Sequence, residues 1–298
     1  MNVYLENVNL SSTTGPNYFA QKLVKYMGLR GNIFDPTLSY DIKLAFIESH
    51  GLRQDLPMVH RLDGVYFNAN FDCDKMNYNI RRTYDASKGV IFQTNFNKDL
   101  IFNWFGPHDN YQVINNGSDV ISIRNIPEGF QEYSQKYDNI WSCAAHWHSF
   151  KRLKSNIEYF LNFSQENDCL LIAGSNPDEI VAHPRIFYVG DLDSNTLLSL
   201  FKASTYFIHL AYLDHCPNVV IDARACGCQI ICASSGGTKE IAGNGATIVQ
   251  EPDWDFSFIK QTSPPLLNYE EILDNEIDSP VSMAIAAKEY ERFLKSLL

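Results

Sequence analysis

The sequence lacks long hydrophobic runs and has no excess of positive charge. Its 298 residues include 24 Lys and Arg against 35 Asp and Glu, which gives a net charge of −11. An acidic chain gains nothing from a phosphate backbone or an anionic membrane surface, so we expect no nucleic-acid partner. The apolar runs are also far shorter than the ~20 residues of a membrane span, and we expect no stable membrane insertion.

The cysteines do not have the spacing of a zinc ribbon or finger. There are seven, an odd number, and Cys226 and Cys228 are too close together for a zinc site. Cys169 and Cys232 lie in apolar, strand-like runs, where thiols usually act as small buried hydrophobes. Residues 1–14 have neither the basic start nor the apolar core of a signal peptide. We therefore expect reduced thiols and a cytoplasmic protein.

The common nucleotide and hydrolase motifs are absent. Without GxGxxG, GxxxxGK[ST] or GxSxG, dinucleotide-dependent redox chemistry, P-loop hydrolysis and an α/β-hydrolase lose support. The DxD pattern of metal-assisted sugar transfer occurs twice, at residues 72–74 and 191–193. This pattern is only three residues long, and Asp191 and Asp193 are typical of a turn and a helix cap. We expect no bound metal and no cofactor.

Length and periodicity predict two α/β domains. At about 150 residues per domain, the chain has room for two. Short apolar strands alternate with amphipathic segments, which indicates βαβ units and parallel sheets. We predict domains over 1–125 and 126–280, followed by a helix over 281–298 whose apolar positions must dock.

The individual elements follow from apolar spacing and from turn residues. In the first half we predict strands at 3–5, 56–62, 90–93 and 111–114, and helices at 18–27 and 97–104. The second half is clearer, with strands at 140–145, 169–173, 186–189, 206–210, 229–233 and 246–249. Helices are predicted between them at 153–162, 195–203 and 217–226. The strand at 246–249 is expected to close the second sheet.

The most informative segment runs from Leu213 to Gly227. It combines a strand end, a short loop and a helix beginning at Pro217, which together form the ligand crevice of an open α/β sheet. Backbone N–H groups and the positive dipole end of such a helix can hold a diphosphate. Asp222 lies roughly 7–8 Å along the helix, where its carboxylate can accept hydrogen bonds from ribose hydroxyls. Asp214, before the helix, would face the opposite end of the ligand. The spacing alone favours the structural interpretation, in which one Asp is a helix-start carboxylate and the other is solvated or paired in the core.

This segment resembles the donor site of retaining glycosyltransferases of family 4, which have the GT-B fold. Their pattern is an acidic residue, seven intervening residues, a second acidic residue and then Ala-x-Ala-x-Gly. Here it reads Asp214…Asp222-Ala223-Arg224-Ala225-Cys226-Gly227. The resemblance is strong over about residues 139–250. It is moderate at residues 111–119, which are similar to the Asn-Gly-x-Asp end of the family's first domain.

The resemblance implies roles for individual residues. Lys151 would neutralise the donor diphosphate, and Gly15 would approach it from the first domain. Asp222 would bind the ribose, and Asp214 would lie near the transferred sugar. Both are one methylene shorter than the family's glutamates. His146 stands where the family has an arginine, and a histidine is charged only part of the time near neutral pH.

The resemblance also implies a wider set of site residues. The expected catalytic residues are Lys151, Asp214 and, on the acceptor side, His60 or Asp63. A buried ion pair among His60, Arg61 and Asp63 is the structural alternative. The expected donor-binding residues are Gly15, His146, Lys151, Arg152, Gly174, Gly190, Asp214, His215, Cys216, Pro217, Asn218, Val219 and Asp222.

The implied fold is GT-B, with two Rossmann-like domains whose parallel sheets face a cleft and a C-terminal helix that crosses back to the first domain. The implied function is retaining, metal-independent transfer of a hexose from a GDP- or UDP-sugar to a glycan or glycoprotein acceptor. The alternatives are a nucleotide-sugar epimerase on the same fold and an inactive nucleotide-sugar-binding protein. The short first domain suggests a trimmed acceptor side, as in a compact viral genome. A homodimer is left open.

Overall fold

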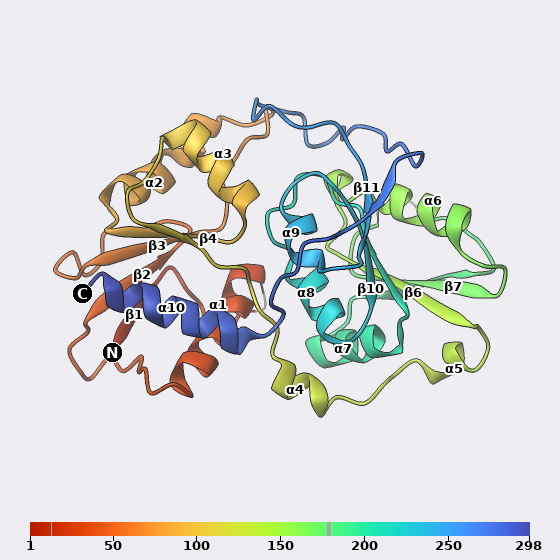
Figure 1. Ribbon diagram of the computed structural model, residues 1–298, viewed down its shortest axis with the longest axis horizontal. Helices are drawn as coiled ribbons and strands as arrows, with labels where there is room; N and C mark the ends of the chain where they lie inside the picture. The colour runs from red at the N-terminus through yellow and green to blue at the C-terminus, as the bar shows by residue number, and fades with distance from the viewer. Residues whose placement is uncertain (13, 178–179) are drawn as a thin grey trace. The chain divides into compact units, whose positions relative to one another are not determined.

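The chain folds into two compact units, each built on a parallel sheet with helices (Figure 1). The computed structural model describes residues 1–12, 14–177 and 180–298. Unit 1 comprises residues 1–118, 255–259 and 282–298, and unit 2 comprises residues 119–254 and 260–281. The predicted pair of Rossmann-like units is confirmed. None of the helices in the described ranges is long and apolar enough to span a membrane.

In the part of unit 1 that the structure describes, five parallel strands lie in the order β1-β2-β3-β4-β5. They are β1 (Val3–Glu6), β2 (Ile42–Phe46), β3 (Met58–Leu62), β4 (Gly89–Phe92) and β5 (Tyr111–Val113). After helix α1 (Gly15–Gly28), Ile33 makes a parallel bridge with Asn2 beside β1. The chain then forms β2, which pairs with β1 in parallel. The segment at Ile33 therefore lies along one edge of β1, and β2 lies along the other.

Helices cover both faces of this sheet (Figure 1). α1 and the C-terminal helix α10 (Met283–Ser296) pack together on one face, and α2 (Cys73–Ala86) and α3 (Asn95–Phe105) lie on the other. The side chains of β2 alternate, so Leu44 and Phe46 join the α1 and α10 side chains in one apolar cluster. The C-terminal helix therefore crosses back to the first unit and contacts α1, as predicted.

The sequence prediction missed β2 and α2 because polar residues interrupt their apolar patterns. In β2, Lys43 is buried, and its ammonium pairs with the equally buried Glu6 carboxylate at 3.1 Å. In α2, Asn77 is buried and exchanges two hydrogen bonds with the backbone of Tyr66, at 2.7 and 2.8 Å. Each of these groups is satisfied by a partner outside its own element, which local periodicity does not reveal.

Among the described residues of unit 2, seven strands lie in the order β12-β11-β10-β9-β6-β7-β8. In chain order they are β6 (Asn139–Ala144), β7 (Asp168–Ala173), β8 (Ile186–Gly190), β9 (Tyr206–His209), β10 (Gln229–Ala233), β11 (Thr247–Val249) and β12 (Ile272–Asp274). The prediction that residues 246–249 close the sheet is wrong, because β12 pairs antiparallel with β11 beyond them.

Three helices of unit 2 fall close to their predicted positions: α6 (Leu153–Phe163), α7 (Ser194–Ala203) and α8 (Asn218–Ala225). Unit 2 also contains α4 (Val120–Arg124), α5 (Gln131–Ser134) and α9 (Thr238–Ala242), three short helices that were not predicted.

The strand order of unit 2 reverses beside β6. The chain places β7 and β8 on one side of β6 and then returns to place β9 on its other side. Loops that leave the carboxyl ends of β6 and β9 therefore diverge, and the crevice between them is the usual ligand position in an open α/β sheet.

A buried arginine ties the elements of unit 1 together. Arg61, in β3, is 1% exposed and pairs with Asp63. Its guanidinium also donates hydrogen bonds to the Tyr290 hydroxyl of α10 and the Asn116 side-chain oxygen, both at 3.0 Å. It lies 4.0 Å from the centre of the Phe19 ring of α1. The ion pair between Arg61 and Asp63, the structural alternative for this motif, is thus present.

We expect replacement of His60 to reduce the pH dependence of stability. His60 is wholly buried in β3, and burial lowers its pKa to about 4 although the hydrogen bond with the Ile47 carbonyl opposes this. The unfolded chain therefore binds more protons below pH 6.5, and stability present at neutral pH falls as the pH drops toward 4.

His60→Gln keeps a donor for the Ile47 carbonyl but does not titrate. Between pH 7 and 5, its free energy of unfolding should fall by about 1–2 kcal/mol less than that of the wild type. Urea denaturation at the two pH values measures this difference. His50→Gln, at an exposed position, is the matched control. Equal pH slopes for wild type and His60→Gln would contradict the prediction.

Candidate active site

The crevice of unit 2 brings Lys151 and Asp214 together. Lys151 ends the short 3-10 turn Ser149–Lys151 that follows β6, and Asp214 follows β9. The Lys151 ammonium donates a hydrogen bond to the Asp214 carboxylate. The two side chains are 19% and 16% exposed. The residues expected beside the diphosphate and the transferred sugar therefore lie next to each other at the point where the strand order reverses.

Both members of this pair adjoin residues in the left-handed backbone region. Arg152, directly after Lys151, has φ 51°, and Leu213, directly before Asp214, has φ 54°. Residues other than glycine rarely adopt this conformation, and surrounding structure must hold them there. The two sharp changes of backbone direction turn the lysine and the aspartate toward each other.

Backbone contacts fix the loops that carry the pair. The Phe150 carbonyl accepts a hydrogen bond from the Tyr212 N–H at 2.7 Å, which joins the turn after β6 to the loop after β9. The Asp214 carbonyl accepts one from the Gly237 N–H at 2.8 Å. Gly236 has φ 76°, and a Cβ there would overlap the Asp214 backbone. Glycine is thus required for the loop after β10 to approach Asp214.

His209 is a second partner of Asp214. It ends β9, is 4% exposed, and its Nε2 lies 3.0 Å from the Asp214 carboxylate. Burial lowers the pKa of His209 despite the neighbouring aspartate, so its ring is neutral at pH 7 and Nε2–H donates to Asp214. Burial alone would raise the pKa of Asp214, but Lys151 and His209 outweigh it and lower that pKa. Asp214 is therefore an ionised carboxylate with two donors.

Sequence reasoning missed His209. The available signal was a histidine that ends an apolar strand five residues before the first acidic residue of the motif. Such a histidine is ordinarily read as part of the core, and only the fold brings its ring to the carboxylate.

The structure gives Arg152 partners inside unit 2. Its guanidinium pairs with the Glu251 carboxylate at 2.6 Å and donates to the carbonyls of Pro265 at 2.7 Å and Leu210 at 3.3 Å. Arg152 and Glu251 side chains are each 2% exposed. Arg152 therefore anchors the turn that carries Lys151, although the resemblance placed it among the donor-binding residues.

Helix α8 begins at the crevice. Pro217 precedes it in an extended conformation, so the helix starts at Asn218, one residue later than predicted. Cys216 is buried in the apolar core of unit 2 and Val219 packs against that core, which anchors the start of the helix. Asp222 lies four residues after Asn218, roughly 6 Å along the axis, and is 8% exposed.

The other expected residues of unit 2 lie at the carboxyl ends of its strands. Exposed His146, after β6, has Nδ1 2.6 Å from the Ser175 hydroxyl after β7. Gly174 donates its N–H to the Gly190 carbonyl at 2.8 Å, and a Cβ at Gly174 would overlap the Ala145 carbonyl. The loops after β6, β7 and β8 are therefore joined. Beside Asp214, burial lowers the pKa of His215 to about 4.

Gly15, His60 and Asp63 belong to unit 1. Gly15 is the first residue of α1, and His60 is enclosed in β3. Asp63 accepts hydrogen bonds from Arg61 and Gln93, and burial raises its pKa although Arg61 opposes the rise.

The two DxD sequences form helix caps. Asp72 accepts a hydrogen bond from the Lys75 N–H at 3.1 Å, and Asp193 accepts from the Asn195 and Thr196 N–H groups at 2.9 and 3.1 Å. The expectation that Asp193 is a cap residue is confirmed. Across the residues that the structure describes, no three His, Cys, Asp or Glu side chains are grouped to hold a metal ion.

Comparisons with known proteins agree with this geometry. Residues 148–257 match the family model described as Glycosyl transferases group 1. No curated protein matches the sequence significantly. Among solved structures, HepE of Anabaena in complex with UDP and glucose is 12% identical with a TM-score of 0.68, over 99% of this chain and all of that one.

Two further structures show the same fold. The sucrose-phosphate synthase of Thermosynechococcus elongatus is 12% identical with a TM-score of 0.61, over 100% of this chain and 93% of that one. A glycosyltransferase of Rickettsia africae is 16% identical with a TM-score of 0.60, over 87% and 86%. The fold is therefore GT-B. The residues that match the model for group 1 glycosyl transferases include Lys151, Asp214 and Asp222.

We expect a measurable coupling between His209 and Asp214. His209→Leu removes a hydrogen bond to a charged group, whose contribution is about 1.5–3 kcal/mol. In a double-mutant cycle with Asp214→Asn, the two changes in unfolding free energy should be non-additive by about 1–3 kcal/mol. Pairing His209→Leu with Asp191→Asn, at an exposed site, is the additive control. Additivity in both cycles would show that the contact contributes nothing.

Proposed function

We propose that the chain transfers a hexose from a UDP- or GDP-sugar, without a metal and with retention of anomeric configuration, to a hydroxyl of a glycan or glycoprotein. The observation that carries the proposal is the Lys151–Asp214 pair, held in the crevice from which α8 begins. A cation and a helix N-terminus suit a diphosphate. A carboxylate four residues into the helix, Asp222, suits a ribose.

Lys151 would act on the leaving group. As the sugar departs, negative charge develops on the diphosphate, and a prepositioned ammonium stabilises that charge in the transition state. The α8 N-terminus adds the positive end of its dipole. Lys151 is suited to this role because its contact with Asp214 and the anchored turn hold the ammonium in place before the donor binds.

Asp214 would position the transferred sugar. Its pKa is lowered, so it stays ionised and can accept hydrogen bonds from hexose hydroxyls but cannot serve as a proton donor. In the proposed step, the bond between the anomeric carbon and the phosphate oxygen breaks, and a bond to the acceptor oxygen forms on the same face. The acceptor proton passes to the departing phosphate oxygen, so no protein nucleophile takes part.

The first donor to test is UDP-glucose. HepE, which shares the fold, was solved with UDP and glucose. The acceptor class, a glycan or glycoprotein, follows from the family resemblance.

Substitutions in the crevice should distinguish the residue that binds the diphosphate from the residue that binds the ribose. Lys151→Ala should weaken binding of both UDP and pyrophosphate by about 10–100-fold, because it removes a charged hydrogen-bond donor. Asp222→Asn should weaken UDP but leave pyrophosphate unchanged. Isothermal titration calorimetry measures both. Lys154→Ala, exposed on α6, is the control. Near-normal UDP affinity in both site variants would refute the assignment.

A ligand panel tests the donor and the reaction. A nucleotide at 100 times its dissociation constant adds about 2.7 kcal/mol to stability, enough to raise the melting temperature by several degrees. UDP, GDP, ADP and their sugars should be compared, with NAD expected to have no effect.

Transfer is then followed by NMR of the anomeric signal, with and without chelator. Acceptor-independent isomerisation would favour the epimerase, and binding without turnover an inactive binder.

A further inference from the structure

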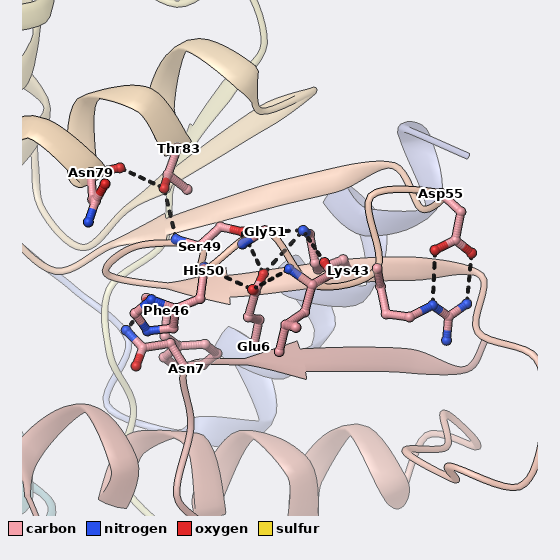
Figure 2. A network of polar contacts seen from close by, with 12 residues as sticks. Glu6, Asn7, Lys43, Phe46, Ser49, His50, Gly51, Asp55, Asn79 and Thr83 are labelled. Atoms are coloured by element: carbon pink, nitrogen blue, oxygen red, sulfur yellow. Dashed lines mark hydrogen bonds and ion pairs between the residues drawn. The ribbon is translucent and has the colours of Figure 1, made fainter.

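Part of the unit 1 sheet is covered by a loop instead of a helix. Between β2 and β3, residues 47–57 contain no helix and run back beside the strands (Figure 2). Between this loop and α2 lies a hollow of about 1090 Å³. Its lining combines apolar and polar residues, and the polar ones include Lys43, Ser49, His50, Asn79, Arg82 and Lys88.

A buried charge holds the loop that lines the hollow (Figure 2). Glu6, 1% exposed, accepts a hydrogen bond from the Ser49 hydroxyl at 2.6 Å and from the N–H groups of His50 and Leu52 at 2.9 and 3.1 Å. Burial alone would raise the pKa of Glu6, but these bonds and Lys43 lower it. The loop is therefore held to the sheet by a charged group whose partners are all in place.

The two walls are also joined to each other. The Ser49 N–H donates to the Thr83 hydroxyl of α2 at 2.8 Å, and that hydroxyl donates to the Asn79 carbonyl at 2.8 Å. The Lys43 ammonium donates to the Leu52 carbonyl at 2.7 Å. Because these contacts span the loop, the sheet and α2, the hollow is formed before any ligand arrives.

The charge of the lining is opposite to that of the whole chain. The net charge of the chain is −11, yet three cations line the hollow against one carboxylate, Asp85. Lys43 is neutralised by Glu6, and Asp85 lies 3.7 Å from Arg81 on the same helix. Arg82 and Lys88 therefore supply the positive charge of the hollow.

Neither of these two cations has a carboxylate within 4.0 Å among the described residues. The Lys88 ammonium donates to the Leu297 carbonyl at 2.7 Å. The Arg82 guanidinium lies 5.7 Å from the centre of the Tyr78 ring. Both side chains are exposed at the rim of the hollow and can meet an anion there.

The hollow extends along the sheet. A second hollow of about 410 Å³ shares Asp85, Ser87 and Lys88 with the first and continues to Phe105, His108 and a second carboxylate, Asp109, which lies beyond the part lined by Arg82. Drug-sized ligands occupy pockets of about 300–1000 Å³. A groove of this length and polarity therefore suits a chain of several sugar rings better than a single one.

We propose that this groove binds a short acidic oligosaccharide. The planar guanidinium of Arg82 matches a carboxylate, and Lys88 adds a second charge. The side chains of Asn79 and Gln54 offer donors and acceptors for sugar hydroxyls. The inference goes beyond the proposed function, because the groove uses residues of unit 1 and none of the donor crevice.

Calorimetric titration of the whole chain with trigalacturonate tests the proposal, with uncharged maltotriose as the matched probe. Trigalacturonate should bind saturably, and added salt should weaken it. Arg82→Gln/Lys88→Gln should lose about fivefold or more in affinity, as two partly exposed charge pairs would give. Lys75→Gln/Lys98→Gln removes the same charge from unit 1 outside the lining and should change the affinity little.

Three results would overturn the proposal: no saturable binding of trigalacturonate, equal losses in the two double variants, or equally tight binding of maltotriose. A UDP titration of the same samples keeps the two assignments apart. Intact UDP binding with no response to trigalacturonate would refute the groove alone. Intact trigalacturonate binding without any response to nucleotides would refute the proposed donor site alone.

Discussion

The ion pair between Lys151 and Asp214 requires hydrogen-bond donors and close backbone contacts, which several elements of unit 2 supply. A largely buried carboxylate is tolerated only where donors surround it. His209 supplies one donor from β9, and the turn after β6 supplies the other. Gly236 permits the approach that lets the Gly237 N–H bond the Asp214 carbonyl. Because these groups converge only where the strand order reverses, the topology of the sheet and the chemistry of the crevice depend on each other.

Much of the second unit could be predicted from the sequence because its buried strands are apolar and its helices amphipathic. The same reasoning failed for β2 and α2, where Lys43 and Asn77 are polar yet buried. Their partners, Glu6 and Tyr66, come from other elements. Periodicity records which residues are apolar, but it does not record which polar residues will find a buried partner elsewhere. The short strand β12 was missed for lack of any such pattern.

The candidate site shows the same division between local and tertiary information. The motif gave Asp214, Asp222 and the start of α8, because a loop and helix start are local features. The adjacent basic residues Lys151 and Arg152 look equivalent in sequence, yet the left-handed Arg152 sends its side chain to Glu251, 99 residues away. The role of Arg152 therefore depends on a contact that no local pattern contains.

The C-terminal helix has a consequence for the order in which the chain is made. Tyr290 and Leu294 belong to the apolar cluster of unit 1, and Tyr290 receives the Arg61 hydrogen bond. Residues 282–298 leave the ribosome after every residue of unit 2. The first unit is therefore completed last. The apolar surface on its α1 side is not yet covered by α10 while unit 2 is synthesised. This reverses the usual N-terminal-first order of domain folding.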